Sequence, residues 1–159
     1  MTSLEQEIGL LLRQKGLTLG VVESATGGLI SHRLTNIPGS SDYYKGSVTT
    51  YSNEVKVRVV GVRESTINRH GAVSPQVAEE MARGGRRVLA ADICLADTGI
   101  AGPGGATPDK PVGLFYIGLS HGARTYSRKH SFQGERGQNK QSATEAALGW
   151  LKEYLLSLE

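Results

Sequence analysis

The sequence predicts an α/β protein, a three-layer α/β/α sandwich with a mixed, mostly parallel sheet. Three observations lead to this class. Helical and strand-like segments alternate along the chain, as in layered α/β domains. Residues 17–22 and 92–98 are short and largely apolar, as buried central strands are. Residues 114–120 and 123–131 flank a His-Gly turn and predict a hairpin, so the sheet is mixed. The length predicts a single domain over residues 1–159.

The first forty residues predict helix, strand and helix in that order. Apolar residues between positions 4 and 12 fall on one helical face, and Gly16 can end that helix. The strand at 17–22 runs into a turn of small residues at 23–28. The apolar stripe that follows predicts a second helix, which Pro38 stops.

The middle of the chain predicts one strand and three helices. Residues 46–52 have a strand-like pattern, and Asn53 is predicted to cap a short helix that Gly61 closes. Residues 63–69 predict another short helix. Ser74 followed by proline is a typical helix start, and an apolar face follows it.

The last third begins with the strand at 92–98, which runs into a loop at 99–113 with five glycines and three prolines. Such a loop at the end of a strand is a usual place for a binding site. The hairpin follows, and residues 147–158 supply the apolar face of a C-terminal helix.

Composition excludes several classes of protein. The net charge of +3 is spread along the chain, so a solvated surface is favoured over a nucleic-acid interface. The four histidines and Cys94 show no metal-ligand spacing, and Cys94 is predicted to be buried. No apolar run reaches the ~20 residues of a membrane span, and the first residues do not resemble a signal peptide. We therefore expect a cytoplasmic protein without metal or cofactor.

The stretch 39–56 concentrates side chains that can carry chemistry. Ser40 and Ser41 lie on a turn that a glycine begins, and Lys56 follows the next strand-like segment. A serine is a nucleophile only if a base takes its proton, and a lysine can be that base only when it is neutral. Valines flank Lys56, which is consistent with partial burial. The plain alternative, which these residues alone favour, makes both serines turn residues and Lys56 a surface charge.

The turn at 23–28 offers a possible anion site. Ser24, Thr26 and the backbone N–H groups of Gly27 and Gly28 stand at a predicted helix start, where unpaired amides and the helix dipole favour negative charge. The alternative is a helix that Thr26 caps.

The glycine-rich loop and a single arginine add two further elements. Thr98, Gly99 and Gly102 could present a hydroxyl group and free amides to a developing oxyanion, although the loop could also be a simple lid. Arg136 is placed to bind a carboxylate or a phosphate, and its alternative role is a salt bridge with Glu135.

Six ordered blocks of this chain resemble the signature blocks of the CinA C-terminal domain, the nicotinamide-nucleotide amidohydrolase family. The blocks are ESATGG, GSSDYYKGSVTTYSNEVK, HGAVS, TGIAGPGG, KPVG and FQGER. The resemblance spans essentially all 159 residues and matches the stand-alone form of the domain. It implies a three-layer α/β/α fold and metal-free hydrolysis of nicotinamide mononucleotide to nicotinic acid mononucleotide and ammonia. It also implies a pyridine nucleotide substrate and a homo-oligomer, whereas the spread charge and the lack of a long apolar run predict no nucleic-acid or membrane partner.

The resemblance also implies roles for individual residues. Ser41 would be the nucleophile, with Ser40 and Ser24 as alternative hydroxyls. Lys56 would be the base, and the Tyr51 hydroxyl would support that lysine. Thr98 and Arg136 would contact the substrate or the transition state, and further substrate-binding positions would be Ser24, Thr26, Gly27, Gly28, Gly99 and Gly102.

Three residues depart from the family pattern. Ala25 stands where the family usually has a cysteine, which should matter little if that side chain only packs. Asp97 places a carboxylate beside Thr98, where it could repel an anionic substrate or perturb Lys56. Lys140 stands where arginine is common, and lysine cannot make the same bidentate contact. A non-catalytic nucleotide-binding or regulatory module is therefore the alternative function, and a nucleic-acid-associated competence factor is a third.

Overall fold

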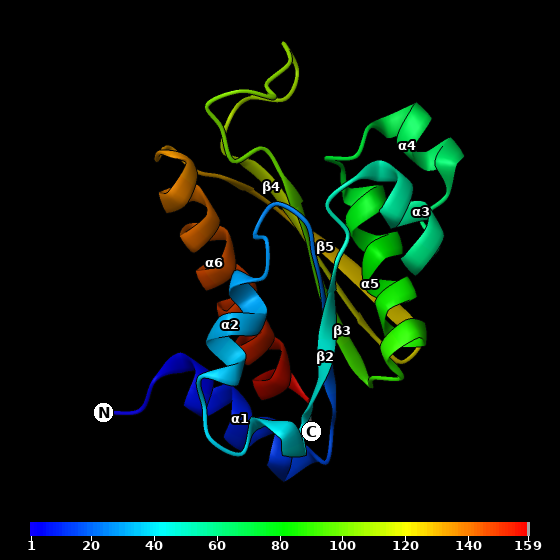
Figure 1. The fold of residues 1–159 in the computed structure, drawn as a ribbon. Helices are drawn as coiled ribbons and strands as arrows, with labels where there is room; N and C mark the ends of the chain where they lie inside the picture. Colours follow the sequence, from blue (N-terminus) through cyan, green and yellow to red (C-terminus); the bar gives the residue numbers. More distant parts are fainter. Residues whose placement is uncertain (159) are drawn as a thin grey trace.

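Five strands form one mixed sheet in the order β2-β1-β3-β4-β5 in the computed structural model, which describes residues 1–158 (Figure 1). Strand β1 pairs in parallel with β2 and β3, whereas β3 with β4 and β4 with β5 are antiparallel. The strands are β1 (Leu19–Glu23), β2 (Tyr44–Thr49), β3 (Ile93–Gly99), β4 (Leu114–His121) and β5 (Arg124–Ser131). The predicted α/β class and mixed sheet are confirmed.

The prediction of a mostly parallel sheet is wrong, because two of the four strand pairs are antiparallel. A parallel return from β3 to β4 would require a crossover helix. The connection is instead the glycine-rich loop, which contains no helix and returns β4 along the edge of β3.

Within residues 1–158, six α-helices cover the two faces of the sheet (Figure 1). On one face, α1 (Leu4–Lys15), α2 (Leu29–Thr35) and α6 (Arg136–Ser157) pack in one apolar cluster with residues of β1, β3 and β4. On the other face, α3 (Asn53–Val60), α4 (Glu64–His70) and α5 (Pro75–Leu89) pack in a second cluster with Val22, Cys94 and Ala96. Cys94 is buried, as predicted.

The helix ends follow local sequence signals. Ser3 and Gln6 form a capping box at the start of α1, and Gly16 ends the helix in the left-handed region, with φ 64°. The Ser74 side chain accepts from the Val77 N–H at the start of α5. Helix α3 is capped by Ser52 and not by Asn53, so the predicted cap was one residue late.

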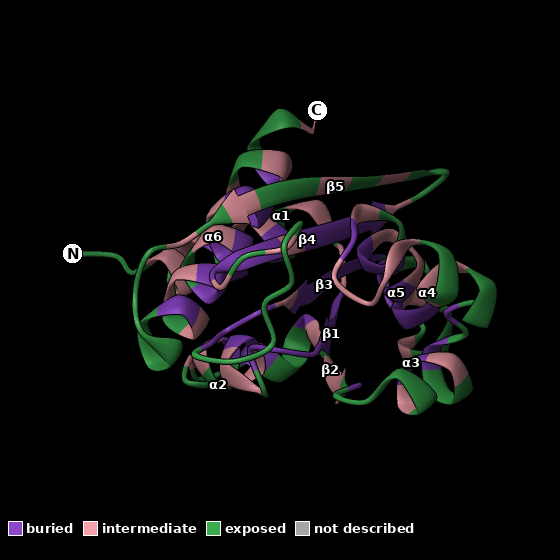
Figure 2. Ribbon diagram, turned by 90° about the horizontal axis from the view of Figure 1, so that it is seen from above, coloured by how far each residue is buried: buried purple, intermediate pink, exposed green. Residues whose placement is uncertain are grey.

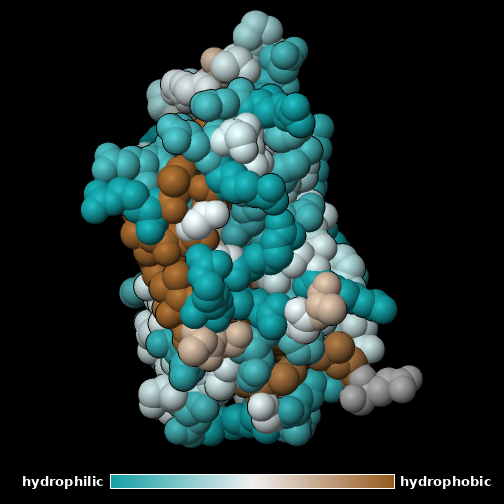
Figure 3. Space-filling model, turned by 90° about the vertical axis from the view of Figure 1, so that its right-hand side faces the viewer, coloured by the Kyte–Doolittle hydropathy of each residue, from teal (hydrophilic) through white to brown (hydrophobic). Residues whose placement is uncertain are grey.

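Burial separates the inner strands from the edge. Nearly every residue of β1, β3 and β4 is buried, whereas β5 alternates between exposed and half-buried side chains (Figure 2). The side of the molecule on which α3 to α5 lie carries a band of apolar surface among polar side chains (Figure 3). Exposed valines on these helices include Val59 and Val88. Within residues 1–158, no helix combines the length and the hydropathy that a membrane span requires.

Candidate active site

The carboxyl ends of β1, β2 and β3 meet at one edge of the sheet, at the top in Figure 1. The chain leaves β1 toward α2 on one face and leaves β2 toward α3 on the other face. Ligands of open α/β sheets bind where neighbouring connections diverge in this way. A cavity of about 330 Å³ opens here, and its lining includes Ser24, Tyr51, Lys56, Thr98 and Arg136.

Lys56 is the central side chain of this cavity. It projects from α3, and only 2% of its surface is exposed. Its Nζ lies 2.9 Å from Ser24 Oγ, 2.8 Å from the Thr50 carbonyl oxygen and 3.2 Å from the Tyr51 carbonyl oxygen. A neutral amine has two hydrogens and one lone pair. The two carbonyl groups can accept the two hydrogens, which leaves the lone pair directed at the Ser24 hydroxyl.

Burial lowers the pKa of Lys56, because a buried ammonium ion loses its hydration. The negative charge of Asp97 acts in the opposite direction and raises that pKa. Burial is the larger effect, so the environment lowers the pKa of Lys56 and shifts it toward the neutral amine that proton abstraction requires.

Ser24 stands on the turn that follows β1, and 6% of its surface is exposed. Its backbone N–H donates to Asp97 Oδ1 over 2.9 Å. Asp97 is fully buried in β3, so it does not contact the cavity directly. Burial raises the pKa of the Asp97 carboxyl group to about 6, and hydrogen bonds from Thr26 and Ser24 oppose that rise.

The predicted pairing of Ser41 with Lys56 is wrong. Ser41 is exposed in a short 3-10 helix, Ser40–Asp42, that precedes β2, whereas Lys56 follows β2. The six residues of β2 span roughly 20 Å and place the two side chains at opposite edges of the sheet. Ser40 lies at the same distant edge. Of the three hydroxyls considered, Ser24 is the one that the structure brings to Lys56.

The predicted anion site at the start of α2 is also wrong, because an internal carboxylate occupies it. Glu23 accepts hydrogen bonds from the N–H groups of Gly28, Ile30 and Ser31 over 3.0–3.1 Å. The Gly27 N–H donates to the Ser24 carbonyl oxygen. The Thr26 hydroxyl lies between buried carboxyl groups. Glu23, the acid that begins ESATGG, was the sequence signal for this arrangement.

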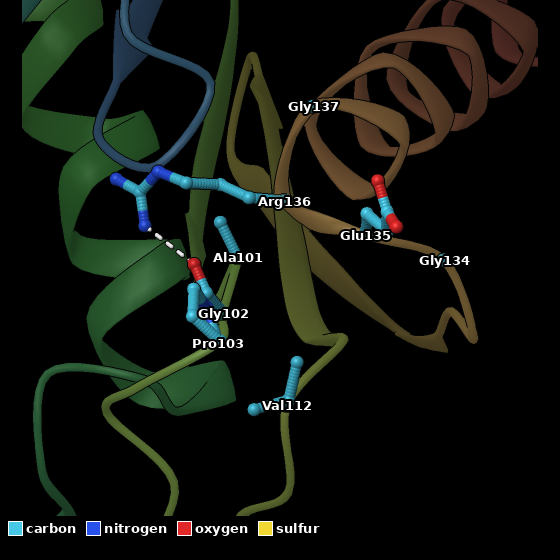
Figure 4. Close-up of a pocket in the computed structure, with 8 residues that line it drawn as sticks. All are labelled: Ala101, Gly102, Pro103, Val112, Gly134, Glu135, Arg136 and Gly137. Atoms are coloured by element: carbon cyan, nitrogen blue, oxygen red, sulfur yellow. Dashed lines mark hydrogen bonds between the residues drawn. The ribbon is translucent and has the colours of Figure 1, made fainter.

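Arg136 begins α6 and spans the mouth of the site. It donates through Nη1 to the Gly102 carbonyl oxygen over 2.8 Å, as Figure 4 shows, and through Nη2 to the Tyr51 hydroxyl over 3.1 Å. The predicted support of Lys56 by the Tyr51 hydroxyl is therefore wrong. Of the two Tyr51 oxygen atoms, the carbonyl oxygen is the one that accepts a hydrogen bond from Lys56. Within residues 1–158, Arg136 forms no salt bridge with Glu135.

A second cavity of about 630 Å³ adjoins the first (Figure 4). Ala101, Gly102 and Arg136 line both cavities, so the arginine and the start of the glycine-rich loop form their common wall. The Asn139 side chain ties that loop to α6, because Nδ2 donates to the carbonyl oxygens of Ala101 and Gly134. Sequence reasoning missed Asn139, which has no surrounding motif.

The end of β3 supplies the floor of the site. The Thr98 hydroxyl donates to the Ala72 carbonyl oxygen over 2.8 Å, which joins β3 to the HGAVS segment. Gly99 packs on Phe115 so closely that a Cβ atom would lie 2.2 Å from the ring. Both residues line the cavity that holds Ser24 and Lys56, as the predicted grouping requires. Among the described residues, no cluster of His, Cys, Asp and Glu could hold a metal ion.

Comparisons with known proteins give a consistent result. The sequence model described as the CinA C-terminal domain matches residues 1–155. A protein of Halothermothrix orenii named as competence-damage inducible is 53% identical over 157 residues, which cover 97% of this chain and 38% of that relative. The CinA-like protein of Chloroherpeton thalassium is 48% identical over 156 residues, 96% of this chain and 37% of the relative. The chain thus spans less than two fifths of the length of these curated relatives.

Solved structures match over nearly their whole length. The competence damage-inducible protein A of Klebsiella pneumoniae has a TM-score of 0.95 and 31% identity, and the match covers 98% of this chain and 97% of that one. The competence/damage inducible protein of Agrobacterium tumefaciens has a TM-score of 0.86 and 33% identity, with 99% and 100% covered.

Proposed function

Since the chain belongs to the CinA C-terminal domain family, we propose that it is an amidohydrolase that converts nicotinamide mononucleotide to nicotinic acid mononucleotide and ammonia. The observation that carries this proposal is the 2.9 Å contact between the buried Lys56 amine and Ser24 Oγ. The substrate is inferred from the family resemblance, and the residues that act on it are inferred from the geometry of the site.

The proposed reaction has two stages. Lys56 takes the Ser24 hydroxyl proton as Ser24 Oγ attacks the carboxamide carbon, and the carbonyl oxygen becomes an oxyanion. Lys56 then returns the proton to the amide nitrogen, the C–N bond breaks, and ammonia leaves an acyl ester on Ser24. A water molecule gives a proton to Lys56 and attacks the ester. The C–O bond to Ser24 breaks, Ser24 regains its proton from Lys56, and the carboxylic acid is released.

Two surrounding groups are proposed to hold the substrate. Arg136 is the cation at the mouth, and its guanidinium group can bind the phosphate once it exchanges its bond to the Tyr51 hydroxyl. The backbone near Gly99 faces the same cavity as Ser24 and is the candidate donor to the oxyanion, whereas Thr98, whose hydroxyl donates to the Ala72 carbonyl oxygen, holds this end of β3 in place.

The direct test measures ammonia release from nicotinamide mononucleotide by the wild type and by Ser24→Ala and Ser41→Ala. We expect Ser24→Ala to lose at least about 10³-fold in kcat, because no nucleophile remains. Ser41→Ala is the matched control at the other end of β2 and is expected to keep wild-type activity. Wild-type activity in Ser24→Ala would refute the proposed nucleophile.

One observation favours a second candidate, a nucleotide-binding module without turnover. The Asp97 charge raises the pKa of Lys56 and so opposes formation of the neutral base. Such a module would be stabilised against heat by nicotinamide mononucleotide but would release no ammonia at any pH between 6 and 10. Ammonia release that depends on Ser24 would exclude this candidate.

A further inference from the structure

Two buried carboxyl groups lie beneath the Ser24 turn and face each other across one hydroxyl. Glu23 and Asp97 are both fully buried. The Thr26 hydroxyl oxygen lies 2.6 Å from Glu23 Oε1 and 2.5 Å from Asp97 Oδ1. A hydroxyl group has one hydrogen, so it can donate to only one of these carboxyl groups. The other contact is a hydrogen bond only if that carboxyl group carries a proton of its own.

Glu23 accepts more backbone hydrogen bonds than Asp97 does. Its carboxylate accepts three backbone N–H groups, from Gly28, Ile30 and Ser31. Asp97 accepts two, from Ser24 and Thr26. Hydrogen bonds to a carboxylate stabilise its charge, so the proton of the cluster belongs on Asp97. The burial that raises the pKa of Asp97 to about 6 acts in the same direction.

Asp97 is coupled to Lys56 through one residue. Ser24 donates its N–H to Asp97 and places its Oγ against Lys56 Nζ, with 2.9 Å at each contact. In a buried site, charges this close interact strongly because little water screens them. An ionised Asp97 therefore stabilises the ammonium form of Lys56, and a protonated Asp97 does not.

Within residues 1–158, the other elements place both apolar and titratable side chains around the pair. The residue opposite Asp97 on β4 is Ile117, which is apolar and buried. The side chains that bring charge or a titratable group near the cluster from other elements are Tyr44 of β2, whose hydroxyl binds Ser31, Lys140 of α6 beside Gly27, and Arg136 of α6 beside Tyr51.

We propose that Asp97 is a positioning residue whose charge decides whether Lys56 is an ammonium ion or a neutral base, and that Glu23 and Thr26 control this charge by holding a proton on Asp97. With the proton on Asp97, the cluster carries one negative charge, and Lys56 loses its proton readily. After Asp97 ionises, Lys56 loses its proton only at higher pH. The catalytic meaning rests on the proposed function, whereas the charge coupling is a property of the free protein.

The test follows the Lys56 side chain by NMR, using lysine labelled with ¹³C at Cε and a Lys56→Met sample to assign its signal. Asp97→Asn removes the charge and keeps an acceptor for the Ser24 N–H. We expect this variant to lower the titration midpoint of Lys56 by about 1–2 pH units. Glu54→Gln is the matched control, because it removes one carboxylate from an exposed position on α3, two residues from Lys56. It is expected to move the midpoint by less than about 0.3 units, since exposed charges are screened.

An unchanged Lys56 midpoint in folded Asp97→Asn would overturn the inference. If that variant does not fold, the wild type labelled with ¹³C at the aspartate Cγ is the second test, and the Lys56 signal must then show a step at the pH where Asp97 titrates. The absence of this step would equally overturn it. If the Lys56 titration midpoint shifts in Asp97→Asn but the wild type releases no ammonia, the charge coupling is supported and the proposed function is rejected. In an active enzyme, the midpoint of the acid limb in the pH profile of kcat/KM should shift to lower pH by the same 1–2 units in Asp97→Asn. A purely structural role would not produce this shift.

Discussion

The two ends of strand β2 carry similar side chains in opposite surroundings. At the amino end, Ser41 is exposed, and Arg13 donates to the Gly39 carbonyl oxygen and to Asp42. At the carboxyl end, Lys56 is buried, and Arg136 donates to the Gly102 carbonyl oxygen and to the Tyr51 hydroxyl. The residue types are alike at both ends, but only the carboxyl end of β2 lies with the carboxyl ends of β1 and β3. Strand direction, rather than local composition, decides where chemistry is possible.

The lysines of the two ends give the largest expected contrast. Lys56→Met keeps the apolar stem and removes the amine, and we expect kcat/KM to fall about 10²- to 10⁴-fold, as for loss of a general base. Lys45→Met, at the exposed amino end of β2, should leave the rate of ammonia release within about twofold of the wild type. Equal losses in the two variants would remove the distinction between the ends.

The pH dependence of the free energy of unfolding reports on Asp97, a buried acid that has no counterpart among the described residues at the amino end. The pKa of Asp97 is raised from 3.8 to about 6, so the folded protein holds a proton there that the unfolded chain releases. This group therefore contributes stability below about pH 4, and that contribution is lost as the pH rises toward 6, by roughly 3 kcal/mol in total. Urea unfolding at pH 4.5 and 6.5 should show about two thirds of this loss in the wild type and none of it in Asp97→Asn, because most of the remainder occurs below pH 4.5. A loss of equal size in both proteins would contradict the assignment.

The arginines offer a third contrast, in substrate binding. Arg136→Ala should raise the KM for nicotinamide mononucleotide about 10- to 100-fold, because one charged hydrogen-bond donor to the phosphate contributes about 1.5–3 kcal/mol. Arg13→Ala also removes an arginine that holds a carbonyl group and is expected to leave KM unchanged. Steady-state kinetics of both variants measure this, and an unchanged KM in Arg136→Ala would place the phosphate elsewhere.

Glycines at the two ends give the smallest expected effect. A Cβ atom at Gly99 would meet the ring of the buried Phe115, so Gly99→Ala should lower the free energy of unfolding by about 1–3 kcal/mol. At Gly39 the nearest atom is the flexible tip of Arg13, and the cost comes mainly from the positive φ of 81°, about 1 kcal/mol. Thermal or urea unfolding of both variants tests this order. A larger loss in Gly39→Ala would reverse it.

Much of the fold could be predicted from the sequence because its signals are local. Gly16, Ser74 with Pro75, and Gly61 mark helix ends in the structure as they do in the sequence. No local signal predicts the numbers of parallel and antiparallel strand pairs, because these depend on the direction in which the loop after β3 returns the chain. That loop has the composition of a binding loop whichever way β4 runs.

The site could be predicted in part. Lys56, Thr98, Gly99, Gly102 and Arg136 line one cavity, as expected. The choice of Ser41 failed because closeness in sequence suggested closeness in space, whereas β2 separates the two residues and parallel pairing brings Ser24 from β1 instead. The anion site failed because Glu23, the first residue of the motif itself, fills it from within. Such pairings depend on tertiary structure and leave no local signal.

The most direct test of the central claim is to trap the covalent intermediate. The wild type would be mixed with nicotinamide mononucleotide, quenched in acid during turnover, digested and sequenced by mass spectrometry. The mechanism predicts an acyl group on Ser24, absent from Ser24→Ala and present in Ser41→Ala. An acyl group on Ser41, or one that forms unchanged in Ser24→Ala, would contradict the assignment of Ser24 and Lys56 as the reacting pair.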